Sequence, residues 1–379
     1  MSKPLKIMIS AGEASGDRLG AGLARSLRAQ HPDIELIGMG GEEMEAAGVK
    51  IVQQASEVAV VGITEVLAHL PAIRRAMGRL EDILKTEKPD LLVPVDFPDF
   101  NLRLTARAHD AGVPVVYFVS PQIWAWRRSR VKLMRRLVKR VLVLFPFESS
   151  FYESEGVPVT FVGHPGVEGL TETPERAPLI QGAGLDPERP VVALLPGSRV
   201  GEVDRLLEPL LGAAGIVQQR RPGTQFLLQR ANTLPADFLD ARVAAAGLTD
   251  AVIHTGHYPE ILTACDAGAV ASGTASLESA LAGLPMVVVY RMKAMSYFIG
   301  RMLVKVPHIA MPNLIAERRV VPELIQGECT PEAIAEELAG YLEDPGRIAR
   351  VREELAEVRR RLGDPGAFER AAAAVLGEA

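Results

Sequence analysis

The stretch VVALLPGSRVGE, residues 191–202, constrains the fold of this chain more than any other. Its first five residues are apolar and predict a buried strand, Pro-Gly ends that strand, and Gly201 to Val217 has the periodicity of a helix. A turn between a strand and a helix directs free N–H groups and the positive end of the helix dipole toward a ligand. We therefore expect an anion site, with Ser198 and Arg199 contacting a diphosphate. The alternative is an ordinary junction with a surface arginine.

Strands and helices alternate along the whole 379-residue chain, which predicts parallel sheets with right-handed crossovers. The fold class is α/β, with two doubly wound, Rossmann-like domains whose strand ends face one another across a cleft. Residues 171–190 contain prolines at 174, 178 and 187 and have no clear period, so we expect a linker there. The expected divisions are an N-terminal domain (1–170), the linker (171–190), a C-terminal domain (191–350) and closing helices (351–379). The expected strands are 5–10, 34–39, 91–95, 113–119, 141–145 and 159–162, then 191–195, 224–229, 251–254, 267–271 and 286–290.

The composition excludes several classes of protein. Hydrophobic residues make up 48% and charged residues 23%, as in ordinary globular proteins, and the net charge of −5 disfavours a nucleic-acid binder. Cys265 and Cys329 lack the spacing of a zinc site and favour a reducing compartment. The chain begins without a signal-peptide pattern and has no apolar run of about 18 residues. We expect a cytosolic protein whose membrane contact is peripheral.

A second phosphate-type turn, SGTAS at residues 272–276, follows an apolar strand and precedes a helix. The N–H groups of residues 273–275 would meet phosphate, and Glu278, expected in the first turn of the helix, would accept the ribose hydroxyls. An N-cap with a dipole-favouring glutamate is the alternative. Two such turns in one domain favour a nucleotide diphosphate site, and no P-loop motif is present.

The N-terminal counterpart, AGEASGD at residues 11–17, is small and acidic. Gly16 allows close approach of the backbone to a ligand, and Glu13 and Asp17 suit sugar hydroxyls better than phosphate. A tight turn with helix-capping acids is the alternative.

Asp96 and Asp99 in VDFPDFN follow a predicted strand and so lie at its ligand-binding edge. A base that deprotonates a sugar hydroxyl needs this place and some burial, and Asp96, nearest the strand end, is the favoured candidate. Asp99 with Asn101 could form only a turn or an N-cap. The rival bases are His164 and His257.

The segment from Arg127 to Arg140 has eight basic residues, no acidic one and an interleaved apolar stripe, after Trp124 and Trp126. A solvated basic face is one explanation, and an anionic membrane surface or a phosphorylated lipid is the other. Residues 295–306, with Arg291 nearby, have the same mixture, although a core helix would too.

Eight motifs, in order from residue 11 to residue 317, resemble the lipid-A-disaccharide synthase family: AGEASGD, VSPQIWAWR, FPFE, VGHP, LLPGSR, SGTASLE, YRMK and MPNLIAE. The resemblance implies a GT-B glycosyltransferase with an N-terminal acceptor site and a C-terminal UDP site. The implied reaction joins UDP-2,3-diacylglucosamine to 2,3-diacylglucosamine 1-phosphate with inversion and without metal, releasing UDP. The implied location is the cytoplasmic face of the inner membrane of a Gram-negative bacterium.

Carried over by motif, the family's essential aspartate falls on Asp96, its diphosphate-contacting arginine on Arg199, and its asparagine in MPNLIAE on Asn313. This chain has Phe97 where the family commonly has alanine, and Glu317 where it commonly has glycine. The expected sites are catalytic, Asp96, Asp99 and Glu13; nucleotide-binding, Ser198, Arg199, Ser272, Gly273, Thr274, Ser276 and Glu278; acceptor-binding, Gly12, Ser15, Gly16, Asp17, Trp124, Arg291 and Asn313; and metal, none.

Two other functions fit the same residues. A UDP-N-acetylglucosamine 2-epimerase would share the fold and the UDP site but would need no lipid surface. A non-catalytic nucleotide-binding adaptor at the membrane would tolerate the loss of Asp96. The C-terminal helices could return to the first domain or exchange between subunits of a homo-oligomer, and no cofactor is expected.

Overall fold

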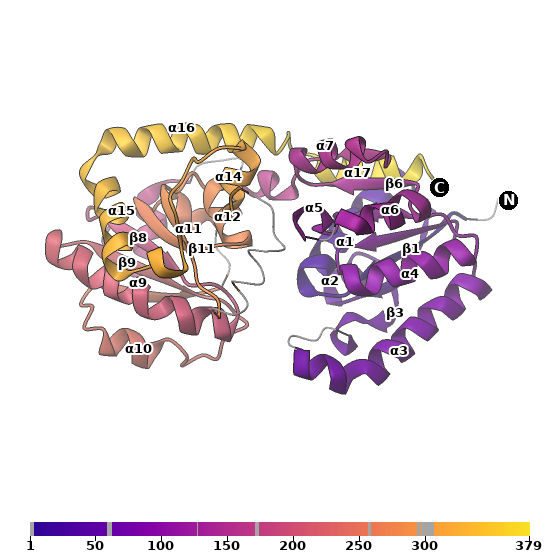
Figure 1. Ribbon diagram of the computed structural model, residues 1–379, viewed down its shortest axis with the longest axis horizontal. Coiled ribbons are helices and arrows are strands. Elements are labelled where there is room, and N and C mark those ends of the chain that lie inside the picture. The colour runs from indigo at the N-terminus through magenta and orange to yellow at the C-terminus, as the bar shows by residue number, and fades with distance from the viewer. Residues whose placement is uncertain are drawn as a thin grey trace. The chain divides into compact units, whose positions relative to one another are not determined.

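The computed structural model describes residues 4–58, 63–126, 128–170, 174–256, 259–293, 297 and 307–379 (Figure 1). The chain forms two compact units. Unit 1 comprises residues 1–165 and 363–379, and unit 2 comprises residues 166–362. Each unit is built on one parallel sheet with helices on both faces, as the alternation of strands and helices predicts.

Unit 1 has a seven-stranded sheet in the order β3-β2-β1-β4-β5-β6-β7. Its central strands are almost entirely buried because helices cover both faces, and this explains why they read as continuous apolar runs. The strands are β1 Lys6–Ala11, β2 Glu35–Gly40, β3 Lys50–Gln54, β4 Leu91–Val95, β5 Val116–Phe118, β6 Arg140–Val143 and β7 Val159–Phe161. The helices are α1 Ala14–Gln30, α2 Glu42–Ala46, α3 Ile63–Thr86, α4 Pro98–Asp110, α5 Ile123–Trp126, α6 Val131–Leu137, α7 Pro146–Ser154 and α17 Ala367–Leu376.

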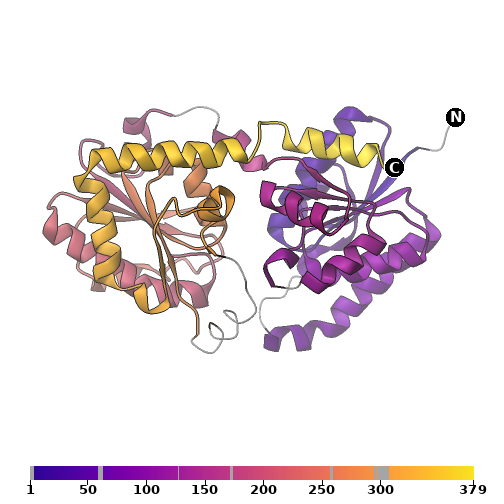
Figure 2. The same cartoon turned by 45° about the horizontal axis from the view of Figure 1, so that its top comes forward.

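Unit 2 has a six-stranded sheet in the order β10-β9-β8-β11-β12-β13. The strands are β8 Val191–Leu195, β9 Gln225–Arg230, β10 Ala251–Thr255, β11 Ala267–Ala271, β12 Met286–Tyr290 and β13 Glu323–Ile325. The helices are α8 Arg176–Gly182, α9 Val200–Arg220, α10 Asp240–Ala245, α11 Pro259–Thr263, α12 Thr274–Leu281, α14 Met311–Ala316, α15 Pro331–Glu343 and α16 Pro345–Arg361. Helix α16 packs on α12 and α14 (Figure 2).

The structure has two edge strands, β3 and β13, that the sequence analysis did not predict. Strands β3 and β13 lie at the ends of their sheets, and each has only a few residues and an incompletely buried face. Such short, half-polar segments give a weak period-two signal. The other strands lie within a few residues of their expected positions.

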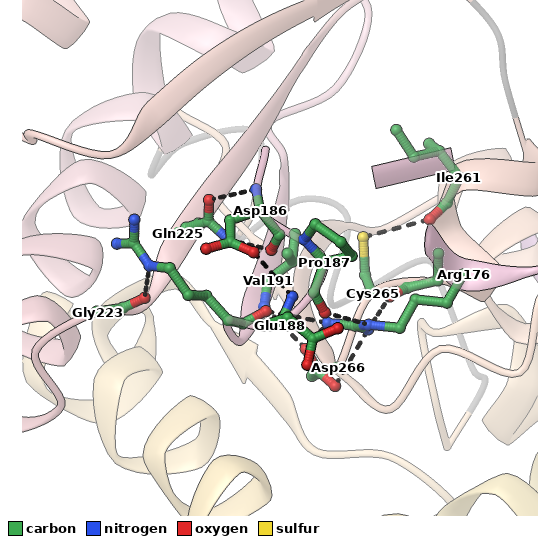
Figure 3. Close-up of polar contacts among 12 residues, drawn as sticks. Arg176, Asp186, Pro187, Glu188, Val191, Gly223, Gln225, Ile261, Cys265 and Asp266 are labelled. Carbon is green, nitrogen blue, oxygen red and sulfur yellow. Dashed lines mark hydrogen bonds and ion pairs between the residues drawn. The ribbon is translucent and has the colours of Figure 1, made fainter. Parts of the chain in front are cut away.

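Residues 174–190, expected within the linker, belong to unit 2. Arg176 of α8 donates to the carboxylate of Asp266 at 3.0 Å and to the carbonyl of Arg189 at 3.0 Å (Figure 3). Asp266 also accepts the N–H of Val191, the first residue of β8, at 2.8 Å. This network attaches residues 174–190 to the sheet of unit 2. The sequence shows no periodicity there because individual polar side chains, and not an apolar face, make the attachment.

The C-terminal helices divide between the two units. Helix α16 ends in unit 2, and the chain then returns to unit 1, where α17 packs on α1. Ala371, Ala372 and Val375 of α17 are buried in the same core as Leu23 and Leu27 of α1. Within this single chain, α17 therefore packs on the first domain.

Candidate active site

The carboxylates of unit 1 come together because two neighbouring strands end side by side. Strand β1 pairs with β4 in parallel, with Ala11 opposite Val95. The next residues, Gly12 and Glu13 after β1 and Asp96 after β4, therefore emerge at the same edge of the sheet. The structure thus brings together two of the three expected catalytic residues, Glu13 and Asp96.

Asp96 has an unusual backbone and an unusual acidity. Both Asp96 and Phe97 have left-handed conformations, with φ of 46° and 49°, which non-glycine residues adopt at a cost and mainly at functional sites. Burial raises the pKa of the Asp96 carboxyl from 3.8 to about 6, and the negative charge of Glu13 adds to the shift. A carboxylate with this pKa is ionised at neutral pH and is a better base than an exposed aspartate.

Asp99, the third expected catalytic residue, is on the surface and pairs with an arginine. Its side chain is 72% exposed and accepts a hydrogen bond at 2.7 Å from Arg130, a residue of the basic segment from Arg127 to Arg140. The structure therefore gives Asp99 a surface ion pair and does not support its expected catalytic role.

The AGEASGD loop divides into exposed and structural residues. Glu13 and Ser15 are exposed and available to a ligand, whereas Gly16 is buried against Ala11 and the carbonyl of Val95. Asp17 is 7% exposed and accepts hydrogen bonds from three backbone N–H groups at the start of α2, those of Gly41, Glu43 and Met44. Its carboxylate caps α2, which corrects the expectation that Asp17 binds sugar hydroxyls.

A buried glutamate that sequence reasoning did not single out anchors Trp124. Glu148 is 3% exposed, and its carboxylate accepts from Ser120 Oγ at 2.9 Å, Trp124 Nε1 at 3.2 Å and the N–H of Phe145 at 3.2 Å. Burial raises its pKa from 4.5 to about 7. The only signal in the sequence is the acid that closes the apolar motif FPFE. The hydrogen bond from its nitrogen to Glu148 thus fixes the position of the Trp124 indole.

The rival base His164 is disfavoured by its surroundings. Burial lowers the pKa of its imidazole from 6.5 to about 4, so the ring is neutral at physiological pH. It lies against the ring of Phe145, with centroids 5.4 Å apart. His257, the other rival, lies outside the described residues.

In the described part of the basic segment, the apolar stripe of α6 faces the core. Val131, Met134 and Leu137 of α6 are buried in the core of unit 1, so the apolar stripe is not a free membrane-binding face. The exposed side chains are Lys132, Arg135, Arg136 and Lys139. Residues 295–306, apart from Tyr297, lie outside the described residues, and Arg291 is half-buried with its Nε donating to the carbonyl of Gln326 at 3.3 Å.

Six of the seven expected nucleotide residues of unit 2 line one cavity of about 370 Å³. It forms because β8 and β11 are adjacent, so the turns that follow them meet at one edge of the sheet. Gly273 has a φ of 131°, which favours glycine, and no atom lies within 4 Å of a Cβ built there. The lining includes Ser198, Arg199, Ser272, Gly273, Thr274 and Glu278.

Two details of this cavity differ from expectation. Glu278 lines the cavity but lies in the second turn of α12, which begins at Thr274. Ser276 is buried; its hydroxyl donates to the carbonyl of Gly273 at 2.7 Å and accepts from the N–H of Met311 at 3.3 Å. It therefore shapes the turn instead of meeting a ligand. The cavity also contains Gln229 and Asn232, near the end of β9, which sequence reasoning missed although polar residues at a strand end were the available signal.

Asn313 is a structural residue of unit 2. It is completely buried, and its Oδ1 accepts from the N–H groups of Val320 and Val321 at 2.7 and 2.9 Å. Its Nδ2 donates to the carbonyl of Val321 at 2.9 Å and to Glu323 at 2.8 Å. With all its hydrogen-bonding groups engaged, it cannot contact an acceptor, which corrects the expected acceptor-binding role.

Among the described residues, no three His, Cys, Asp or Glu side chains cluster as they would around a metal ion. Within the same residues, no helix combines the length and apolar character needed to cross a membrane.

Comparison with known proteins identifies the family. Residues 7–376 match the model of a family described as lipid-A-disaccharide synthetase. The lipid-A-disaccharide synthase of Geobacter metallireducens is 46% identical over 371 residues, covering 98% of this chain and 96% of that protein. The enzyme of the same name from Myxococcus xanthus is 45% identical over 376 residues, covering 99% and 98%.

Solved structures with similar folds are much more distant in sequence. A putative UDP-N-acetylglucosamine 2-epimerase from Listeria monocytogenes has a TM-score of 0.66 at 14% identity, covering 98% of this chain and 96% of that chain. MurG from Acinetobacter baumannii has a TM-score of 0.61 at 16% identity, covering 99% and 100%. These likenesses show the two-domain GT-B fold that the sequence led us to expect.

Proposed function

This chain belongs to the lipid-A-disaccharide synthase family, and we propose that Asp96 is its general base and Arg199 its principal diphosphate ligand. The protein is a glycosyltransferase of lipid A biosynthesis that uses a UDP-sugar donor. The epimerase and adaptor alternatives are not favoured, because the matched family spans nearly the whole chain.

The acceptor chemistry rests on the carboxylate pair of unit 1. The substrates are UDP-2,3-diacylglucosamine and 2,3-diacylglucosamine 1-phosphate. Asp96 removes the proton of the acceptor 6-hydroxyl while that oxygen attacks the anomeric carbon of the donor in line, which inverts the configuration and gives the β-1,6 bond. The supporting observation is the Asp96 carboxyl at the strand edge, whose pKa burial and Glu13 raise to about 6.

The leaving group departs into the cavity of unit 2. The negative charge that develops on UDP is stabilised by Arg199 and by the N-terminal ends of α9 and α12, which provide N–H donors and positive dipole ends. Glu278 accepts the ribose hydroxyls. These groups supply the charge stabilisation that a metal ion supplies in other transferases, so the reaction proceeds without metal.

The proposed membrane location is supported by the exposed basic side chains of α6 and its flank, Lys132, Arg135, Arg136 and Lys139. Such a cluster attracts anionic lipid headgroups by about 1 kcal/mol per basic residue. The protein accordingly binds peripherally to the cytoplasmic face of the inner membrane, where its acylated substrates reside.

The test is product analysis by mass spectrometry with both substrates in detergent micelles and EDTA present. We expect the disaccharide 1-phosphate and one UDP per turnover. Asp96→Asn should lower kcat by about 10²-fold to 10⁴-fold while UDP affinity stays within about twofold; Asp99→Asn is the matched control and should keep near-normal activity. Equal losses in both variants, or a product only without EDTA, would contradict the proposal.

A further inference from the structure

We propose that Asn101 is a positioning residue, whose side-chain amide joins the ends of β1 and β4 and thereby sets the relative placement of Glu13 and Asp96. The inference rests on the proposed role of Asp96 as general base. Asn101 lies in the first turn of α4, three residues after the proline that begins the helix, and is completely buried.

The Asn101 amide contacts both strand ends at once. Its Oδ1 accepts from Ser10 Oγ at 2.7 Å, and its Nδ2 donates to the carbonyl of Ser10 at 3.0 Å. The same Nδ2 donates to the carbonyls of Val95 at 3.2 Å and Asp96 at 2.8 Å. Ser10 lies near the end of β1, just before the loop that carries Glu13. The Asn101 side chain is therefore hydrogen-bonded to both chain segments that carry the carboxylates, Glu13 and Asp96.

These bonds also favour the left-handed backbone at Asp96 and Phe97. The carbonyl of Asp96 accepts two hydrogen bonds, from Asn101 Nδ2 and from the hydroxyl of Tyr117 at 2.8 Å. Both donors are on side chains of the surrounding core, and both bonds need the carbonyl to point inward. They compensate for a conformation that non-glycine residues otherwise avoid.

Only an amide fits this place. The three carbonyls require a donor, and the Ser10 hydroxyl requires an acceptor at the same position. A carboxylate would repel the carbonyls, and an aliphatic side chain would leave buried polar groups unpaired. This explains why Asn101 is buried whereas Asp99, two residues earlier, is on the surface.

Loss of the amide should release the Asp96 carboxyl from its half-buried position. The pKa of Asp96 is raised by burial and by Glu13 from the β1–α1 turn, and is lowered by a hydrogen bond from the backbone N–H of Phe97. The hydroxyl of Tyr117 from β5 faces the Asp96 backbone, and burial and the charges of Asp96 and Asp99 raise the pKa of Tyr117, whereas Arg130 lowers it. With the carboxyl more hydrated and farther from Glu13, its pKa should fall toward the ordinary value of 3.8.

The experiment compares Asn101→Ser with Thr105→Val in the full-length enzyme, by pH profiles of kcat/KM in mixed micelles. Thr105 is the matched control, because it is completely buried one turn farther along α4 and its hydroxyl donates to the backbone carbonyl of Asn101 at 2.8 Å. For Asn101→Ser we expect kcat to fall by about 10²-fold, the KM for the UDP-sugar to stay within about twofold, and the acidic limb to move to lower pH. Thr105→Val should keep the acidic limb of the wild type even if its melting temperature falls.

A folded Asn101→Ser enzyme with the wild-type acidic limb and kcat would overturn the inference. If that variant does not fold, Ser10→Ala provides the second arm, because it removes only the hydroxyl that orients the amide. Its acidic limb should move in the same direction by a smaller amount, and an unchanged profile would overturn the inference. Failure of the proposed base is distinguishable, because Asp96→Asn would then retain the acidic limb of the wild type.

Discussion

The aromatic ring of Phe97 covers the backbone of Gly12. A Cβ built on Gly12 would lie 2.1 Å from Cδ1 of that ring, and the ring also packs on Phe100 with centroids 5.7 Å apart. Gly12 precedes Glu13, and Phe97 follows Asp96. The contact therefore joins the chain segments that carry the two carboxylates, and the aromatic residue that this chain has in place of the family's usual alanine gives Gly12 no room for a side chain.

Gly12→Ala should therefore disturb the active site. The added methyl group must displace the ring and, with it, the left-handed backbone of Asp96 and Phe97. We expect kcat to fall by about 10²-fold, as small displacements of a catalytic group do, with UDP affinity unchanged by isothermal titration. Gly78→Ala, in helix α3 with no atom within 4 Å of the new Cβ, is the control and should keep full activity. Restoring space with Phe97→Ala in the Gly12→Ala background should recover activity, and failure to do so would show that the ring is not the cause.

Arg199→Ala should weaken UDP binding. The residue is the N-cap of α9 and lines the nucleotide cavity, and a charge-assisted hydrogen bond to phosphate contributes about 1.5–3 kcal/mol. We expect roughly ten- to hundredfold weaker UDP binding by titration calorimetry. Arg220→Ala, at the other end of the same helix and paired only on the surface with Glu336 at 2.7 Å, should leave UDP affinity unchanged. Equal effects of the two variants would argue against a diphosphate contact.

Glu148 should make the stability of the protein depend on pH. Its pKa is about 7 in the folded protein and 4.5 in an ordinary environment, so the folded state binds the proton more tightly. The stabilisation is fully present below about pH 4.5 and is lost as the pH rises to about 7. Burial of Asp96 contributes a pH dependence of the same sign. Urea unfolding of the Asp96→Asn variant between pH 5 and pH 8, which removes that contribution, should therefore still show the decline due to Glu148.

Glu148→Gln should abolish that part of the pH dependence. The substitution should also lower the free energy of unfolding by about 1–3 kcal/mol. Both carboxylate oxygens of Glu148 accept hydrogen bonds, whereas the amide NH₂ of glutamine is a donor and would face either the N–H of Phe145 or the donors of Ser120 and Trp124. Tryptophan fluorescence should report the loss of the Trp124–Glu148 hydrogen bond, because Trp124 is one of the two tryptophans in the chain. An unchanged pH dependence in this variant would assign the effect to another group.

Asn313→Ala should act on stability rather than on ligand binding. It leaves buried partners at Val320, Val321 and Glu323 without their hydrogen bonds, and we expect a loss of about 3 kcal/mol in unfolding free energy. UDP affinity of the folded fraction should be unchanged. Asn232→Ala, at an exposed position of the cavity wall, is the converse control and should leave the unfolding free energy within about 0.5 kcal/mol. A loss of UDP affinity without loss of stability in Asn313→Ala would restore its binding role.

Local sequence patterns determined much of this protein. Continuous apolar runs predicted β4, β8, β11 and β12 within one residue, because buried parallel strands have apolar side chains on both faces. The strand-turn-helix order placed Asp96, Arg199 and the SGTAS turn at ligand-binding edges. Glu317 adopts a φ of 56°, a left-handed conformation that glycine, which the family commonly has at this position, adopts without strain.

Only the tertiary structure decided what each polar side chain contacts. Asp17 and Asp99 are both acids next to predicted ligand-binding edges, yet one caps α2 and the other pairs with Arg130 on the surface. Asn101 and Asn313 are buried among backbone groups that the sequence does not bring together, and α6 buries the apolar stripe that suggested a membrane contact. Periodicity reports which face of an element is apolar, whereas hydrogen-bond partners and pKa shifts depend on distances between segments far apart in the chain, and these exist only once the sheet has formed.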